Sequence, residues 1–338
     1  MDLQILWFVM LGILMAGYGI LDGFDLGVGI LHLSVKTDAE RRMMMGSIGP
    51  IWDGNEVWLV VFGGALFAAF PPVYAGAFTG FYLPFMILLF ALILRAVSLE
   101  YRSKKESKIW REFWDCAFFT SSVSAAFIFG VAVGCTLKGL AIDEQGSFFA
   151  TTKELFHPYP IMVGIFAVAT CAMHGSIYLY LKTEGEIQKS VHKWMWQTFG
   201  FFIVAYMLTT ILTLVLLPHA THNFREHPWS WIIVILNVLA IANIPRAIYQ
   251  NKPLYAFISS CCAILAFTFL YGIALFPNLL VSTLDPAWSL TVYNSSSSQK
   301  TLFIMTIIAG LGMPFVLTYT AVVYWVFRGK VKLSEFTY

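Results

Sequence analysis

The sequence predicts an all-α polytopic membrane protein with nine transmembrane helices. The chain has 338 residues, of which 59% are apolar and only 12% are charged, and its mean hydropathy is +0.74. A soluble globular protein is about one-quarter charged. The composition therefore excludes a soluble enzyme, a nucleic-acid-binding protein and a disordered chain. Long apolar runs and a one-sided distribution of basic residues complete the prediction.

The chain contains nine apolar runs. The predicted helices are 4–32, 56–73, 76–98, 113–135, 160–181, 195–217, 230–249, 255–276 and 301–326. Most of them reach the roughly 20 residues that a helix needs to cross a bilayer, and continuous apolar runs do not alternate as barrel strands do. The first run lacks the basic start of a cleavable signal peptide. No connection is long enough for a soluble domain, so residues 1–338 are predicted to form a single integral membrane domain.

The basic residues predict the orientation. If each segment crosses the membrane once, 17 of the 21 Lys and Arg residues fall on one side. Because cytoplasmic connections are enriched in Lys and Arg, this side is the cytoplasm. The N-terminus is then outside and the C-terminus is cytoplasmic, which corresponds to a multi-pass protein of the cytoplasmic (inner) membrane of a bacterium or archaeon.

Two acidic residues interrupt the first apolar run. Asp22 and Asp25 are three residues apart, so they lie on nearly the same face of a helix, in its cytoplasmic half. Acidic residues inside a membrane are costly and usually serve a function, although these two could instead be structural partners of a neighbouring helix. The many glycines of this run permit close approach of another helix.

A second polar cluster begins the second predicted helix. Asp53 and Glu56 lie within a short stretch that also holds Trp52, Asn55 and Trp58. One interpretation is helix capping, because Asp is a good N-cap residue and Glu often follows it by three positions. The other interpretation is proton uptake, because carboxylates at a cytoplasmic surface relay protons by changing their protonation state.

The remaining chemistry-bearing residues predict no metal site. Of the seven histidines only His174 lies well inside a predicted helix, so we expect a hydrogen-bonded core histidine rather than a pair of haem ligands. The five cysteines are expected to pack as small apolar residues. Arg95, at the cytoplasmic end of the third predicted helix, is expected to extend towards the lipid headgroups.

The motifs resemble subunit II of the cytochrome bd quinol oxidases. The similarity is most specific in residues 22–29 (DGFDLGVG), 52–58 (WDGNEVW) and 63–71 (GGALFAAFP), and shorter matches continue to the C-terminal residues 327–330 (FRGK). The motifs occur in order, with nine predicted crossings. The resemblance implies two four-helix bundles plus one peripheral helix.

The resemblance also implies a function. The haem b and haem d groups and the main quinol site would belong to partner subunit I, and this chain would hold no haem, metal or catalytic residue. It would be required for assembly and would supply protons through Asp25 and Asp53, with Asp22 and Glu56 as further candidates. Trp58 would lie on an apolar oxygen path. The complex would oxidise quinol, reduce dioxygen to water and contribute to the proton gradient without pumping.

Some details stay open at this point. Some family members hold a structural quinone in this subunit or bind small single-helix accessory subunits, and the sequence decides neither. Glu56 stands where glutamine is expected in some members, and Cys135 stands where asparagine is expected. The alternatives are a secondary transporter with intramembrane carboxylates, and a purely structural subunit whose aspartates only pack against subunit I.

Overall fold

The computed structural model describes residues 2–148 and 151–331 and is almost entirely helical. Its long helices are α1 (Leu3–Leu31), α3 (Trp52–Ala69), α5 (Tyr82–Tyr101), α6 (Lys108–Lys138), α8 (Pro158–Lys182), α9 (Gly185–Leu216), α11 (Trp231–Tyr249), α12 (Pro253–Leu275) and α13 (Gln299–Val326). Short helices α2 (Asp38–Ile48), α4 (Pro71–Gly80), α7 (Thr152–Leu155) and α10 (His222–Glu226) lie in connections, together with a hairpin of β1 (Asn278–Leu280) and β2 (Leu290–Thr291).

The all-α membrane fold is confirmed. Among the described residues, eight helices are long and apolar enough to cross a membrane. The predicted segment 56–73 corresponds to α3, which is not one of the eight; it has 18 residues and begins with a polar turn. The total of nine crossings therefore stays a prediction.

The second and third predicted segments are wrong at the boundary between them. Phe70 leaves the helical conformation, and Pro71 and Pro72 begin the separate short helix α4. The cause is local, because proline lacks an N–H group and disfavours the helical conformation in the residue before it. Residues 76–80 therefore belong to α4, and the third long helix starts only at Tyr82.

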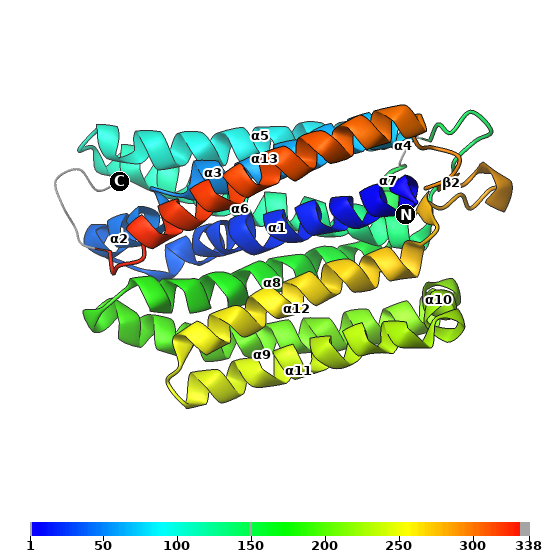
Figure 1. Ribbon diagram of the computed structural model, residues 1–338. Coiled ribbons are helices and arrows are strands. Elements are labelled where there is room, and N and C mark those ends of the chain that lie inside the picture. Colours follow the sequence, from blue (N-terminus) through cyan, green and yellow to red (C-terminus); the bar gives the residue numbers. More distant parts are fainter. Residues whose placement is uncertain (1, 149–150, 332–338) are drawn as a thin grey trace.

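The long helices form two groups, which agrees with the expected pair of bundles. Helices α1, α3, α5 and α6 lie on one side and α8, α9, α11 and α12 on the other, with α13 outside both (Figure 1). The two sets are joined by extensive contacts of α8 with α6 and α1. Helix α1 is central, since it packs against α3, α6, α8, α12 and α13. It touches α8 at backbone distance: a Cβ atom on Gly27 would lie 2.0 Å from the carbonyl oxygen of Cys171.

Helix α13 is held mainly at its two ends. Near its start, the indole nitrogen of Trp7 donates to the carbonyl of Leu302 at 3.1 Å. At its end, Lys182 donates to the carbonyl of Phe327, and Lys330 donates to that of Thr183 at 2.8 Å. Between these contacts most of its side chains are exposed. Helix α13 thus lies across the surface of α1 and α3.

Candidate functional site

Three of the four predicted acidic residues come together with an arginine. Asp22 and Asp25 project from α1, Glu56 from α3 and Arg95 from α5, and both aspartates are completely buried. The Nη2 atom of Arg95 lies 2.7 Å from Asp22 Oδ1 and 2.5 Å from Glu56 Oε1. The cluster thus sets three carboxyl groups against one guanidinium, and two of the three are fully buried.

The expectation that Arg95 extends to the headgroups is wrong. Its side chain is 1% exposed and belongs to the centre of the carboxyl cluster. A basic side chain inside an apolar helix can be stabilised in two ways: it can extend to the lipid headgroups, or it can pair with a buried acidic residue. Here the acidic residues of α1 and α3 provide the buried partners. The sequence of α5 alone does not reveal this pairing.

Asp25 is held by a different partner. The Nδ2 atom of Asn55 lies 2.7 Å from Asp25 Oδ2 and 3.3 Å from the carbonyl oxygen of Leu21. The hydroxyl of Tyr324, on α13, donates to Asn55 Oδ1 at 2.8 Å. Sequence reasoning noted Asn55 as part of a polar cluster but did not assign it a role, and it missed Tyr324, since nothing near Tyr324 in the chain marks it.

Asp53 lies apart from this buried group. It is exposed in the first turn of α3, whose N-cap residue is Ile51, with no side-chain cap. Glu56 is 23% exposed and contacts Arg95 instead of the start of the helix. The capping interpretation of Asp53 and Glu56 is therefore wrong for both residues. The acidic residues lie in order of increasing burial, from exposed Asp53 through Glu56 to Asp25.

Trp58 lines a groove between α3 and α13. The groove has a volume of about 390 Å³, and its lining also includes Asn55, Phe315 and Tyr324. The ring of Trp58 packs directly on α1, because a Cβ atom on Gly17 would lie 2.3 Å from it. The absence of a side chain at Gly17 thus permits the close approach of the tryptophan ring to the first helix.

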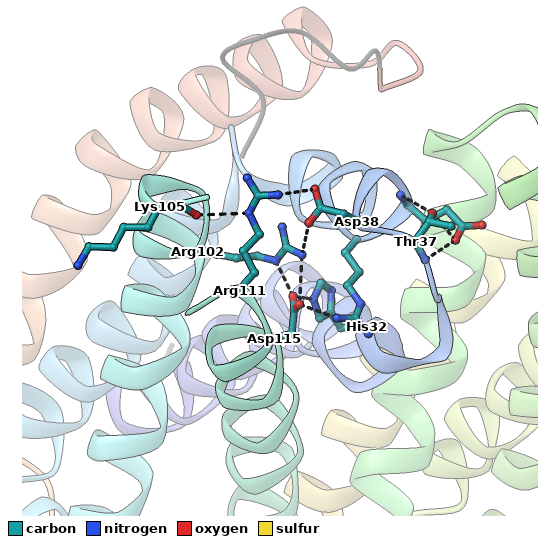
Figure 2. Close-up of polar contacts among 9 residues, drawn as sticks. His32, Thr37, Asp38, Arg102, Lys105, Arg111 and Asp115 are labelled. Carbon is teal, nitrogen blue, oxygen red and sulfur yellow. Dashed lines mark hydrogen bonds and ion pairs between the residues drawn. The ribbon is translucent and has the colours of Figure 1, made fainter. Parts of the chain in front are cut away.

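A second buried ionic cluster closes one end of the bundle (Figure 2). Asp115, on α6, is 1% exposed and faces His32 at 2.5 Å, Arg102 at 2.5 Å and Arg41 at 2.7 Å. Arg102 also forms an ion pair with Asp38 on α2, and Asp38 in turn pairs with Arg111. The cluster joins the ends of α1 and α5 to α2 and α6. Sequence reasoning missed it; the available signal was an aspartate inside the run 113–135.

The same region shows how α2 begins. Thr37 and Glu40 form a reciprocal capping box at the start of the helix. The side-chain hydrogen bond from Thr37 lowers the pKa of Glu40, which keeps this surface carboxylate ionised at the helix N-terminus.

The buried histidines do not fit a bis-histidine haem. His174 Nε2 lies 3.0 Å from the carbonyl oxygen of Ile20, and Nδ1 lies 2.7 Å from the hydroxyl of Ser260. Both nitrogens are therefore engaged, and His174 is the hydrogen-bonded core histidine that was expected. The Nε2 atom of His32 is engaged by Asp115. Within 2–148 and 151–331, no group of three or more His, Cys, Asp or Glu side chains is placed to hold a metal ion.

Comparisons with known proteins identify the family. A family model described as cytochrome bd terminal oxidase subunit II matches residues 3–327. The chain belongs to the cytochrome bd terminal oxidase subunit II family. It is 34% identical to cytochrome bd-I ubiquinol oxidase subunit 2 of Escherichia coli K12 over 98% of this chain and 96% of the relative. It is 33% identical to cytochrome bd ubiquinol oxidase subunit 2 of Bacillus subtilis 168, over 99% of this chain and 98% of the relative.

A solved structure supports the same fold. The bd oxidase of Geobacillus thermodenitrificans contains a chain that matches with a TM-score of 0.78 at 17% identity, over 97% of this chain and 99% of that chain. As a member of the subunit II family, the chain is a multi-pass membrane protein of an oxidoreductase complex and works beside a subunit I partner. The comparisons give no support to the secondary-transporter alternative.

Proposed function

We propose that this chain is the haem-free subunit of a quinol:dioxygen oxidoreductase and that it supplies protons to a haem site in subunit I. The relatives are ubiquinol oxidase subunits, which supports quinol as the electron donor of the complex. The observation that carries the proposal is the buried carboxyl cluster around Arg95 in a chain of this family. Buried ionisable groups of this kind are typical of proton relays in membrane proteins.

The proposed route begins at Asp53 and ends at Asp25. Asp53 is exposed at the start of α3, and Glu56 is partly exposed one turn further along the same helix. Asp22 serves as the counter-ion of Arg95 in this scheme, because its Oδ1 atom lies 2.7 Å from the guanidinium. Among the described residues no cation contacts Asp25, so it is the carboxyl best suited to gain and lose a proton.

The groove that contains Trp58 is the proposed meeting place with subunit I. Its rim includes exposed apolar side chains from both helices, such as Phe315, which is 78% exposed. An apolar surface of this kind suits a protein partner within the bilayer and a dioxygen path beside Trp58. Haem b and haem d belong to subunit I in this proposal, and quinol and dioxygen are substrates of the complex.

The proposed orientation puts the start of α3 in the cytoplasm. Asp22 and Asp25 lie in the second half of α1, and Asp115 contacts His32, which directly follows α1. Helix α2 lies at this end of the bundle (Figure 1). The connections at that end carry most of the basic residues. Protons would then enter from the cytoplasmic side of the inner membrane.

Co-purification tests the proposal. Affinity purification of the tagged chain from its native membrane is expected to yield a coloured complex that contains a second, haem-binding membrane subunit. The same chain expressed alone is expected to be colourless, because His174 has no free nitrogen. A colourless single chain from the native membrane, or a tightly bound haem on the chain expressed alone, would contradict the proposal.

A further inference from the structure

The contacts of Asn55 determine how the two oxygens of Asp25 differ. Asn55 is 2% exposed, and its amide touches three groups: Asp25, the carbonyl of Leu21 and the hydroxyl of Tyr324. Two of these groups, the carbonyl and an ionised carboxylate, only accept hydrogen bonds, whereas the tyrosine hydroxyl can donate. The NH₂ group must therefore face Leu21 and Asp25, and the amide oxygen must face Tyr324.

This orientation leaves Asp25 with two unequal oxygens. Oδ2 accepts a hydrogen bond from Asn55 at 2.7 Å. Oδ1 is buried and has no hydrogen-bond partner among the described residues. A donor aimed at a carboxylate favours its ionised form, so Asn55 helps Asp25 to release a proton.

We infer that Asn55 and Tyr324 are positioning residues for Asp25. The hydroxyl of Tyr324 fixes the amide of Asn55, the amide holds Oδ2, and Oδ1 is left as the atom that takes up and releases the proton. This inference rests on the proposed role of Asp25 in proton transfer. It gives α13, which otherwise lies outside the two bundles, a direct link to the carboxyl cluster.

Other groups around Asp25 do not supply this hydrogen bond. The charged and titratable groups that interact with it are Asp22 on α1, Glu56 on α3, Arg95 on α5, Tyr178 on α8 and Tyr324 on α13. Arg95 makes its contacts with Asp22 and Glu56, and the hydroxyl of Tyr178 donates to the carbonyl of Ser47. His174 on α8 is engaged by Ile20 and Ser260. Asn55 is thus the described side chain that donates to Asp25.

The test uses the purified complex of both subunits, with oxygen consumption measured against pH. Four variants are compared with the wild type: Tyr324→Phe, Asn55→Leu, the double variant and Asp25→Asn. Tyr249→Phe is the control, because it removes a tyrosine hydroxyl from a side chain that is 82% exposed at the end of α11. Haem content per complex is measured for each variant to report folding and assembly.

The sign of the shift follows from the hydrogen bond. Without the hydroxyl of Tyr324 the amide keeps only the Leu21 carbonyl to orient it, so its NH₂ group is held less firmly against Asp25 and stabilises the ionised carboxylate less. Asp25 holds its proton to higher pH, so the alkaline half-activity point of oxygen consumption rises. The expected rise is about one pH unit for Asn55→Leu, which removes the donor entirely, and smaller for Tyr324→Phe. The double variant should match Asn55→Leu, because Tyr324 acts through Asn55.

Two results would overturn the inference. One is a Tyr324→Phe profile equal to that of Tyr249→Phe. The other is haem loss in proportion to activity in Tyr324→Phe and Asn55→Leu, which would assign the pair a structural role only. The Asp25→Asn variant separates this inference from the proposed function: if its turnover is normal, the proton route itself is wrong, whereas a slow Asp25→Asn with an unshifted Tyr324→Phe contradicts the positioning role alone.

Discussion

Substitution of Gly27 by alanine is expected to destabilise the folded chain strongly and to lower the yield of the complex. A Cβ atom at this position would lie 2.0 Å from the carbonyl oxygen of Cys171 and 2.8 Å from the Cα atom of Gly175. Both are backbone atoms of α8, so the two helices would have to separate along their contact. Overpacking of a core typically lowers the free energy of unfolding by about 1–3 kcal/mol. Because the added methyl group would meet backbone atoms, which cannot move as a side chain can, we expect a loss at or above the upper limit.

The measurement is the yield of monodisperse complex in size-exclusion chromatography, together with its midpoint of thermal denaturation. Gly12→Ala is the matched control, because it lies on the same helix and a Cβ atom there would meet nothing within 4 Å. The two variants add the same methyl group to α1. Equal yields and equal midpoints for Gly27→Ala and Gly12→Ala would contradict the close packing of α1 on α8.

Replacement of Asp115 by leucine is expected to have the second large effect. The aspartate is the shared anion of His32, Arg102 and Arg41, and Arg102 is itself only 1% exposed. Removal of one member of a buried ion pair typically costs about 3–5 kcal/mol, because the remaining charge stays buried without compensation. Arg102 keeps its contact with Asp38, but His32 and Arg41 lose the carboxylate that joins them.

Thermal denaturation of the complex measures this effect, with haem content as a second readout. Glu112→Gln serves as the control, because Glu112 lies one turn earlier on α6 in an exposed pair with Lys108 at 3.7 Å. Exposed pairs contribute little to stability. A midpoint for Asp115→Leu that equals that of Glu112→Gln would show that the ionic cluster does not hold this end of the bundle together.

The sequence was sufficient for the features that depend on one segment at a time. Apolar length predicted eight of the spans, and the acidic residues at 22, 25, 53 and 56 stood out because charge is rare in such segments. The glycines of the first helix correctly indicated close approach of a neighbour, which is α8 at Gly27 and Gly175. These are properties of local composition, and lipid as a solvent makes composition informative.

The features that depend on contacts between distant segments could not be predicted. Arg95 alone suggests a side chain that extends to the interface, and its burial becomes clear only when α1 and α3 bring Asp22 and Glu56 beside it. The link from Tyr324 to Asn55 joins residues 269 positions apart. Likewise, the capping interpretation of Asp53 was reasonable from local pattern alone, but the helix begins after Ile51.

Oxygen consumption by the purified complex with Asp25→Asn tests the central claim most directly. An asparagine keeps the shape of the side chain but cannot carry an exchangeable acidic proton. Turnover is expected to fall by about tenfold or more while the haem content and the visible spectrum of the complex stay at wild-type values, with a smaller loss for Asp53→Asn at the exposed end. Wild-type turnover in Asp25→Asn, or loss of haem in step with activity, would contradict the account of this subunit as a proton supply.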